Sequence, residues 1–272
     1  MAQHPVPMQG FPAAQIDTAT PHPARMYNYY LGGRDNYEVD REAAEAFMAK
    51  APDARPSALA NRDFVRRAVR TVVAAGVRQI IDIGTGIPAA PNTHEVAAEV
   101  AAGVRVAYVD NDPIVATHAG ARLTTTGNTS FVLGDLRDPE ALLDAPGIRD
   151  LIDFGRPVAL LLVAVLHFVR DEEDPAGIVR ALAARLAPGS HLVLSHGTLD
   201  FHEQQEDATP VYRRATAPLT LRDRASCLRY FEGFTLLEPG LVRIPLWRPE
   251  DTPPQAPGTA RAALWGGVGV KD

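Results

Sequence analysis

The sequence predicts an α/β protein with a doubly wound, mostly parallel sheet, and two features of the chain support this prediction. The first is an alternation of short apolar runs with segments that begin like helices. The second is that successive runs end in a carboxylate or a glycine turn, as strands do at the ligand-binding edge of such a sheet. The apolar runs predict strands at residues 80–83, 104–109, 130–133, 157–165 and 191–195.

The first predicted strand leads into a glycine turn. This run is apolar apart from Asp82, which is typical of a strand buried on both faces. The sequence Gly84-Thr85-Gly86 then allows a tight turn and a close approach of the backbone to a ligand. Asn92 is a capping residue and predicts the start of a helix. Strand, turn and helix make the front half of a nucleotide-binding βαβ unit.

Carboxylates follow the next two strands as well. Asp110 ends the second run, and the pair Gly134-Asp135 follows the third. Right-handed crossovers bring the carboxyl ends of parallel strands to one edge, so we expect Asp82, Asp110 and Asp135 to meet at a ligand site. Each acid could instead terminate a strand or cap a helix. Pro88 stands where the third glycine of a dinucleotide fingerprint would fall.

The bulk properties restrict the class of protein. With 272 residues the chain can form one large domain or one domain with appendages. A net charge of −6 argues against a surface that coats nucleic acid, and the single cysteine excludes an intrachain disulfide. No signal-peptide pattern opens the sequence, and the longest apolar run, residues 158–166, is too short to span a membrane. We therefore expect a cytoplasmic protein without a nucleic-acid or membrane partner.

The segment before the first strand differs in composition. Residues 1–20 mix proline, glutamine, alanine and glycine, which predicts a flexible tail. Residues 24–37 hold four of the seven tyrosines beside a glycine pair, which favours a loop that lies over a ligand. An ordinary turn with packed tyrosines is the alternative. A short helix around residues 43–48 and a longer one capped by Asn61 and ended by Gly76 are predicted next.

Later elements are marked by their caps. Three Asp-Pro pairs predict helix starts after the later strands, at Asp112-Pro113, Asp138-Pro139 and Asp174-Pro175. The remaining segments after residue 197 are a polar lid (200–217), a helix (221–231), two short strands (234–237 and 241–244), a proline-rich loop (249–258) and a final edge strand (263–270).

Several motifs carry a family resemblance. Four of them, in this order, resemble the class I S-adenosylmethionine (SAM)-dependent methyltransferases: Ile81–Gly86, Tyr108–Pro113, Gly134–Pro139 and the apolar strand ending Leu166-His167. Three further stretches resemble the actinobacterial S-adenosyl methyltransferase family, once catalogued as a domain of unknown function (DUF574): residues 24–37, 92–96 and 238–242. The resemblance implies a Rossmann-like, seven-stranded methyltransferase sheet with an antiparallel last strand and an N-terminal helical cap. It also implies SAM as cofactor and S-adenosylhomocysteine (SAH) as product.

The resemblance also implies roles for residues at the predicted edge. Asp82 and the backbone of Gly84-Thr85-Gly86 would hold the methionine end of the cofactor, and Asp110 would accept hydrogen bonds from both ribose hydroxyls. The remaining cofactor contacts would come from the adenine neighbours Asn111, Gly134, Asp135 (accepting from the amine) and Leu136, from Ala164 after the fourth strand, and from the cap residues Tyr29, Arg34 and Asn36.

Two histidines follow the fourth and fifth strands. His167 is the first candidate for a catalytic general base, because imidazole titrates near neutral pH. His196 is the second, and either ring could instead be a hydrogen-bonded lining residue. No histidine or carboxylate cluster has the spacing of metal ligands, so no metal is predicted.

Three functions remain open from the sequence. The favoured one is methyl transfer to a small-molecule acceptor. An Asn-Pro-Pro-Tyr motif after the fourth strand would mark methylation of a base or a glutamine nitrogen. The sequence has Ala164-Val165-Leu166-His167 there instead, which argues against such an acceptor. The others are an NAD(P)-dependent oxidoreductase and a SAM-binding module without turnover. The predicted organisation is a tail (1–20) and one methyltransferase domain (21–272), divided into a cap (21–60), a cofactor-binding core (61–197) and a C-terminal lid with edge strands (198–272). The sequence does not indicate an oligomeric state.

Overall fold

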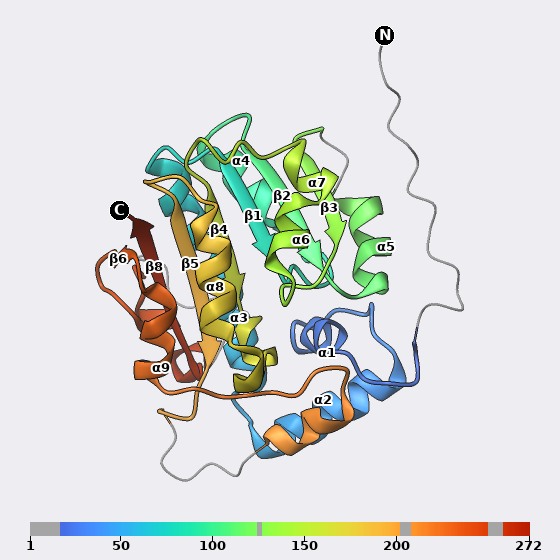
Figure 1. The fold of residues 1–272 in the computed structure, drawn as a ribbon. Helices are drawn as coiled ribbons and strands as arrows, with labels where there is room; N and C mark the ends of the chain where they lie inside the picture. Colours follow the sequence, from blue (N-terminus) through green and yellow to red (C-terminus); the bar gives the residue numbers. More distant parts are fainter. Residues whose placement is uncertain (1–16, 124–126, 202–207, 250–257) are drawn as a thin grey trace.

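An eight-stranded sheet forms the centre of the structure, with helices on both faces (Figure 1). The structure is a computed structural model that describes residues 17–123, 127–201, 208–249 and 258–272. The strand order is β3-β2-β1-β4-β5-β8-β6, and β7 also pairs with β8. The strands are β1 (Gln79–Ile83), β2 (Arg105–Asp110), β3 (Thr129–Leu133), β4 (Ala159–Val163), β5 (His191–Gly197), β6 (Phe234–Leu236), β7 (Val242–Arg243) and β8 (Leu264–Lys271).

The first five strands are parallel, and all five lie where the apolar runs predict them. The last strand, β8, is antiparallel to β5 and β6, which confirms the expected antiparallel end of the sheet. The strand order contains the seven strands of the expected sheet, and the two-residue β7 pairs with β8 as an eighth. One expectation was wrong: strand β8 lies between β5 and β6, and not at an edge. Its glycines permit this position: a Cβ at Gly266 would lie 2.5 Å from the Ile244 side chain.

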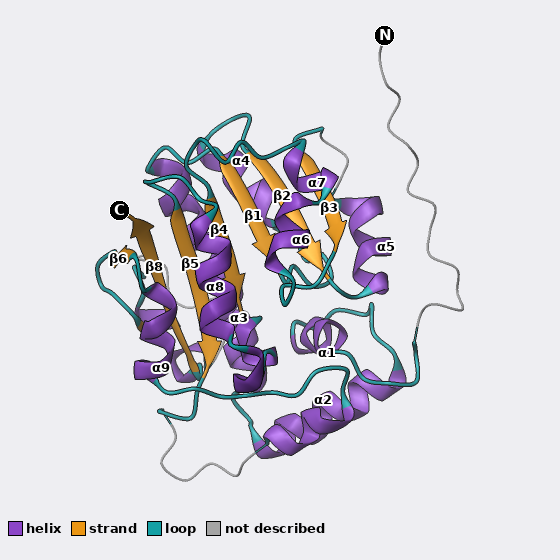
Figure 2. Cartoon of the chain, viewed as in Figure 1, coloured by secondary structure: helices purple, strands orange, loops and turns teal. Residues whose placement is uncertain are grey.

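Alternating side chains of the strands build two cores. Ile81 and Ile83 pack with Leu182 and other residues of the helices on one face, while Ile80 packs with Phe64 on the other. Figure 2 shows these helices on either side of the sheet. The first face is covered by α6 (Pro139–Asp144), α7 (Pro146–Arg149), α8 (Pro175–Ala184) and α9 (Arg224–Leu228), and the second by α3 (Ala54–Ala74), α4 (Thr93–Val100) and α5 (Pro113–Arg122).

Two further helices, α1 (Pro23–Tyr30) and α2 (Glu38–Lys50), lie beyond the carboxyl ends of the parallel strands (Figure 1). The expectation of a loop over residues 24–37 was wrong for its first half. His22 caps α1 by accepting the N–H of Ala24, and Pro23 takes the first helical position. The chain therefore becomes helical before the glycine pair, and only residues 31–37 connect α1 to α2.

Asn61 does not cap a helix, which corrects the prediction made for it. Helix α3 begins earlier, at Ala54, and includes Pro56 in its first turn. Proline is tolerated there because the N–H groups of the first turn have no partner within the helix. Asn61 lies inside α3 and is buried, so its side chain is available for tertiary contacts. The predicted boundary between cap and core, at residues 60 and 61, falls within this helix.

The predicted caps of the later helices are confirmed. Asn92 opens α4 in a capping box, and the aspartates of the three Asp-Pro pairs accept N–H groups at the starts of α5, α6 and α8. Residues 1–16 of the predicted tail, 202–207 of the predicted lid and 250–257 of the predicted loop lie outside the described residues. In the described part of the chain, every helix is too short or too polar to cross a membrane.

Candidate functional site

The carboxyl ends of the parallel strands face a cavity of about 470 Å³. It lies where β1 is flanked by β2 on one side and β4 on the other, the point at which strand order reverses and open α/β sheets bind ligands. Helices α1, α2 and α3 and the 3₁₀ helix η4 (Thr209–Arg214) contribute the opposite wall. The cavity is therefore bounded both by the sheet edge and by the N-terminal cap.

Asp82 lies at the end of β1 and lines this cavity, as predicted. Its Oδ2 atom accepts a hydrogen bond from Oγ1 of Thr93, the first residue of α4, at 2.6 Å. Burial raises the pKa of Asp82 above its usual value, and the bond from Thr93 acts in the opposite direction. Arg62, also in the lining, donates to the carbonyl oxygens of Ala89 and Pro91 and fixes the loop between the glycine turn and α4.

Asp110, at the end of β2, is joined to the glycine turn. Its Oδ2 accepts the N–H of Gly86 at 2.8 Å, and its Oδ1 accepts the N–H of Asp112 at 3.0 Å. Only 6% of Asp110 is exposed, and burial raises its pKa to about 6. Gly84 and Gly86 have φ angles of 75° and 68°, and a Cβ at Gly84 would lie 2.5 Å from the Val165 side chain. The turn thus requires glycine and keeps the cavity open beside a carboxylate with remaining lone pairs.

The predicted adenine neighbours are only partly brought together. Asn111, Gly134 and Leu136 line the cavity, whereas Asp135 is not part of the lining. The Asp135 carboxylate is paired with the guanidinium of Arg137 at 2.9 Å and accepts from Asn111 at 3.4 Å. Arg137 also donates to the carbonyl oxygen of residue 168, so it ties this edge to the segment after β4. To accept a hydrogen bond from the adenine amine, as predicted, Asp135 would have to share its carboxylate between the amine and Arg137.

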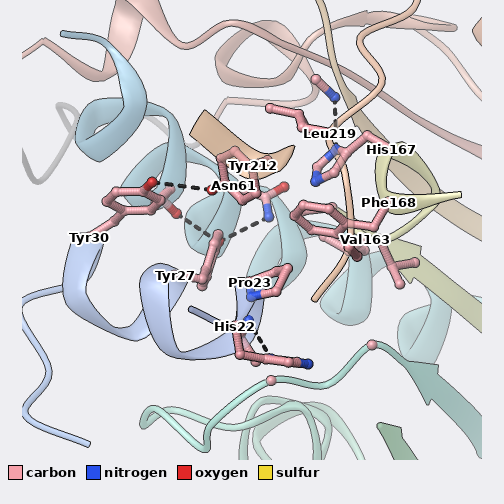
Figure 3. Close-up of a pocket in the computed structure, with 18 of the residues that line it drawn as sticks. His22, Pro23, Tyr27, Tyr30, Asn61, Val163, His167, Phe168, Tyr212 and Leu219 are labelled. Carbon is pink, nitrogen blue, oxygen red and sulfur yellow. Dashed lines mark hydrogen bonds between the residues drawn. The ribbon is translucent and has the colours of Figure 1, made fainter. Parts of the chain in front are cut away.

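A hydrogen-bonded chain connects the end of β4 to the cap. Ala164 lines the cavity with φ at 52°, in the left-handed region, and its N–H donates to Ser195 on β5. The Ser195 hydroxyl donates to Oδ1 of Asn61 at 2.7 Å, and Nδ2 of Asn61 donates to the hydroxyl of Tyr27 at 3.1 Å (Figure 3). Asn61 and Tyr27 both line the cavity. The position of α1 is thereby linked to the strand ends.

His167 lines the cavity and is only 7% exposed. Its Nδ1 accepts the N–H of Gly197 at 3.2 Å, so the neutral ring carries its proton on Nε2. Burial, together with the nearby His196 and Arg222, holds the pKa of His167 well below its usual range. Figure 3 shows the second ring nitrogen turned toward the cavity. His167 thus presents an N–H donor there.

His196 has a structural environment. It is fully buried beside His167, with ring centroids 5.5 Å apart, and is not among the lining residues. Its Nδ1 bonds to the Gly197 carbonyl oxygen, and its Nε2 accepts from Arg222 at 3.0 Å. Burial lowers the pKa of His196 to about 3. Arg222 also donates to Asp171, so this pair holds the segment that carries His167.

The three cap residues predicted to cover the cofactor lie outside the cavity lining. The hydroxyl of Tyr29 bonds to the carboxylate of Glu45, and the Asn36 amide donates to Asn28 at 2.8 Å. Arg34 is also absent from the lining. Other side chains that the sequence analysis did not assign to the site line the cavity instead: Tyr27, Tyr30 and Phe47 from the cap, and Asn61 from α3.

A helical interpretation of residues 23–30 would have found part of this set. On a helix, Tyr27 and Tyr30 lie three positions apart on one side, and Tyr29 points elsewhere. For Phe168 and Tyr212, which also line the cavity, the sequence offers no comparable signal. Among the described residues, no group of three or more histidine, cysteine, aspartate or glutamate side chains is placed to hold a metal ion.

Arg25 and two buried carboxylates seat α1 beside the end of β2. Nε of Arg25 lies 3.5 Å from Asp40 and 3.7 Å from Asp112. The ring of His22, whose Nδ1 accepts the N–H of Ala24 and whose pKa is lowered by burial, lies 3.1 Å from Oδ2 of Asp112. Asp112 caps α5 and lines the cavity, and its Oδ2 is buried without a hydrogen bond. The cap is therefore attached by charge to the same loop that follows Asp110.

Comparisons with known proteins agree with this geometry. A family model described as S-adenosyl methyltransferase matches residues 9–272. A crystal structure of a DUF574 family protein from Streptomyces avermitilis MA-4680 superposes with a TM-score of 0.89 at 43% identity, covering 94% of this chain and 99% of that chain. A crystal structure of a candidate methyltransferase from Thermobifida fusca YX superposes with a TM-score of 0.88 at 36% identity, covering 97% of this chain and 100% of that chain. No curated protein matches by sequence.

A more distant structure shows the fold alone. The N-methyltransferase NodS from Bradyrhizobium japonicum WM9, in complex with SAH, superposes with a TM-score of 0.50 at 14% identity, covering 91% of this chain and 98% of that chain. With the family model, the sheet order, the glycine turn and the carboxylates at the strand ends are those of a SAM-dependent methyltransferase. The chain belongs to the S-adenosyl methyltransferase family, DUF574, as its three characteristic stretches predict. Its cofactor is SAM.

Proposed function

We propose that this protein transfers the methyl group of SAM to a small-molecule acceptor held between the sheet edge and the N-terminal cap. The observation that carries this proposal is the cavity itself. At about 470 Å³ it falls within the range of small-molecule sites, and it must admit both cofactor and acceptor. Residues of α1, α2 and η4 line its far side, which suits a small acceptor better than a nucleic acid or a folded protein.

The proposed cofactor contacts follow from the donor set. Asp110 can accept from two ribose hydroxyls, because each of its oxygens keeps a lone pair beyond the backbone N–H that it already accepts. Asp82 and the glycine turn would hold the methionine end, and Gly134 and Leu136 would contact the adenine. Gly84 and Gly134 are required for packing at the strand ends, since a Cβ would lie 2.5 Å from Val165 at Gly84 and 2.7 Å from Leu142 at Gly134.

Bound SAM supplies a methyl group already activated on a sulfonium, so the protein's contribution is alignment and the exclusion of water. The hydrogen-bonded chain from Ala164 through Ser195 and Asn61 to Tyr27 would keep the wall of the site in place. His167 stands in the lining, as expected for a residue near the acceptor. Because Nδ1 accepts from Gly197, the neutral ring carries its proton on Nε2. His167 is therefore better placed to donate a hydrogen bond to an oxygen than to remove a proton from it.

The test is a calorimetric titration of the full-length protein with SAM, SAH, NAD and NADP. We expect micromolar or tighter binding of SAM and SAH and no binding of either nicotinamide cofactor. Binding of NAD or NADP alone would favour the oxidoreductase and overturn the proposal. If SAM binds, the protein is incubated with SAM and a library of small acceptors, and SAH release is measured by mass spectrometry. Absence of acceptor-dependent SAH would favour the SAM-binding module without turnover.

A further inference from the structure

The end of the cavity under the cap is aromatic. We call this region the aromatic end and define it by Tyr27, Tyr30, Phe47, Phe168 and Tyr212, which all line the cavity. The five residues come from α1, α2, the segment after β4 and η4. Their convergence from separate parts of the chain produces a surface suited to a flat apolar body.

Four of these rings, those of Tyr30, Phe47, Tyr212 and Phe168, form a continuous series. Phe47 meets Tyr212 edge to face with centroids 5.1 Å apart, and Phe168 meets Tyr212 at 5.6 Å. His167 extends the series, with its centroid 4.4 Å from that of Phe168. Figure 3 shows His167 and Phe168 on one side of the cavity and Tyr30 on the other. A planar ligand can therefore contact ring surfaces and His167 at the same time.

The polar atoms at the aromatic end are hydrogen-bond donors. The hydroxyls of Tyr30 and Tyr212 lie 3.2 Å apart and carry two hydrogens, of which their mutual bond uses one. Burial raises the pKa of Tyr212 to about 12 and that of Tyr30 well above its usual value, so both hydroxyls stay protonated. The second hydrogen is left to donate. The Nε2–H of His167 is a further donor in the cavity lining.

The charged groups of the lining already have partners. Arg62 donates to two backbone carbonyl oxygens, Arg25 to two others, and Arg137 to Asp135. The carboxylates that line the cavity are Asp82, Asp110 and Asp112 near the strand ends, Asp53, which faces Arg261 at 3.8 Å, and Asp17, which accepts two backbone N–H groups. Among the described lining residues, the aromatic end therefore offers no unpaired cation to a phosphorylated ligand and no unpaired carboxylate to a protonated amine.

Building on the proposed function, we infer that the methyl acceptor is a planar, weakly acidic hydroxyl compound, a phenol or an enol, bound at the aromatic end with its oxygen toward His167. Its proton leaves to solvent before binding, so the neutral His167 is not required as a base. The oxygen then forms a bond to the methyl carbon as the carbon–sulfur bond breaks. The negative charge of the oxygen and the positive charge of the sulfonium cancel, and the products are a methyl ether and SAH.

The experiment compares two probes with the same ring, 7-hydroxycoumarin and 7-aminocoumarin. Each is titrated by fluorescence into the full-length protein saturated with SAH. We expect the phenol to bind the SAH complex at least about tenfold more tightly than the amine. When SAM replaces SAH, we expect 7-methoxycoumarin by mass spectrometry, formed faster as pH rises and the phenolate forms.

Two variants test whether the tyrosine hydroxyls of the aromatic end hold the ligand. The double substitution Tyr30→Phe/Tyr212→Phe removes both hydroxyls and leaves neither unpaired; it should weaken 7-hydroxycoumarin binding about tenfold without changing SAH affinity. Tyr230→Phe is the control, because Tyr230 is buried and lies outside the cavity lining. Equal or tighter binding of the amine, no binding of the phenol to the SAH complex, or an unaffected double variant would overturn the inference alone. Failure of SAH itself to bind would overturn the proposed function.

Discussion

Nδ1 of His167 accepts a hydrogen bond from the backbone N–H of Gly197 at 3.2 Å, and this contact decides which ring nitrogen carries the proton. Gly197 ends β5, whereas His167 follows β4, so the bond is set by the pairing of these two strands. Replacing Gly197 by a larger residue would crowd Leu221, whose Cδ2 would lie 2.8 Å from the new Cβ, while Nδ1 of His167 would lie at an ordinary contact distance of 3.5 Å. The fold therefore presents Nε2–H to the cavity.

The first prediction concerns the tautomer of His167. Because Nδ1 accepts from Gly197 and burial lowers the ring's pKa, we expect a neutral Nε2–H tautomer at neutral pH and no protonation of the ring in the ordinary titration range of histidine. Nitrogen NMR of histidine-labelled protein measures this directly, and the spectrum of His167→Gln assigns the signal. A ring that titrates near its ordinary value would restore the general-base role predicted from the sequence.

The second prediction concerns Asp110 and pH. Its pKa of about 6 in the ligand-free protein lies above the ordinary aspartate value, and the ribose hydroxyls require the ionised form. SAH affinity should therefore be constant above about pH 7 and fall as pH decreases through 6, approaching tenfold per unit. Isothermal calorimetry at several pH values measures it.

Substitution of Asp110 gives the matching test. Asp110→Asn should weaken SAH binding about 10- to 100-fold, since a hydrogen bond to a charged acceptor contributes about 1.5–3 kcal/mol, and the pH dependence should disappear. Asp138→Asn is the control, because this aspartate caps α6 and is not in the cavity lining. Unchanged affinity in Asp110→Asn would show that the ribose binds elsewhere.

The sheet and the cofactor side of the site could be predicted because their signals are local in sequence. A parallel strand is buried on both faces, so each one appears as an apolar run, and the acid or glycine turn at its end is adjacent. Asp82, Gly84 and Asp110 were found in this way and do line the cavity. The Asp-Pro caps were equally local.

The acceptor side could not be predicted for the opposite reason. Tyr30 and Tyr212 meet although 182 positions separate them, and no local pattern relates the two. Helix α1 has only eight residues, and its tyrosines and neighbouring glycines have a loop-like composition. Short helices are stabilised mainly by tertiary packing, here with Met26 in a cluster with Ala44 and Tyr212.

The third prediction compares two glycines of the same turn. Gly84 and Gly86 both have positive φ angles, which cost another residue about 1–2 kcal/mol. At Gly84 a Cβ would also meet Val165 at 2.5 Å, whereas at Gly86 nothing lies within 4 Å. Urea unfolding should therefore show Gly86→Ala losing about 1–2 kcal/mol and Gly84→Ala about 2–4 kcal/mol.

The cause of that difference is testable with Val165→Ala. Removing the Cγ atoms should recover part of the extra loss in the double variant with Gly84→Ala; recovery is incomplete because the Cβ of Val165 would still lie 2.7 Å from the new methyl group. Additive effects of the two substitutions would contradict a direct contact between these positions.

The last prediction concerns the buried pair that seats the cap. Asp40 is fully buried, lies 3.5 Å from Nε of Arg25, and accepts the N–H groups of His22 and Tyr37. Asp40→Ala removes the nearer carboxylate from a buried guanidinium and the acceptor of two backbone N–H groups, and should reduce the free energy of unfolding by about 3–5 kcal/mol. On the same helix, Glu38 forms an exposed pair with a 3.3 Å separation, so Glu38→Ala should change it by less than about 0.5 kcal/mol.

Both variants are compared by urea unfolding at neutral pH, with SAH affinity as a second measurement. Because Arg25 also lies 3.7 Å from Asp112, which lines the cavity beside Asp110, loss of Asp40 should weaken SAH binding as well as stability. The effect on binding separates a cap that is part of the site from one that is only attached to it. Equal losses of stability in the two variants, or an unchanged SAH affinity in Asp40→Ala, would contradict an ionic attachment of the cap to the cofactor loop.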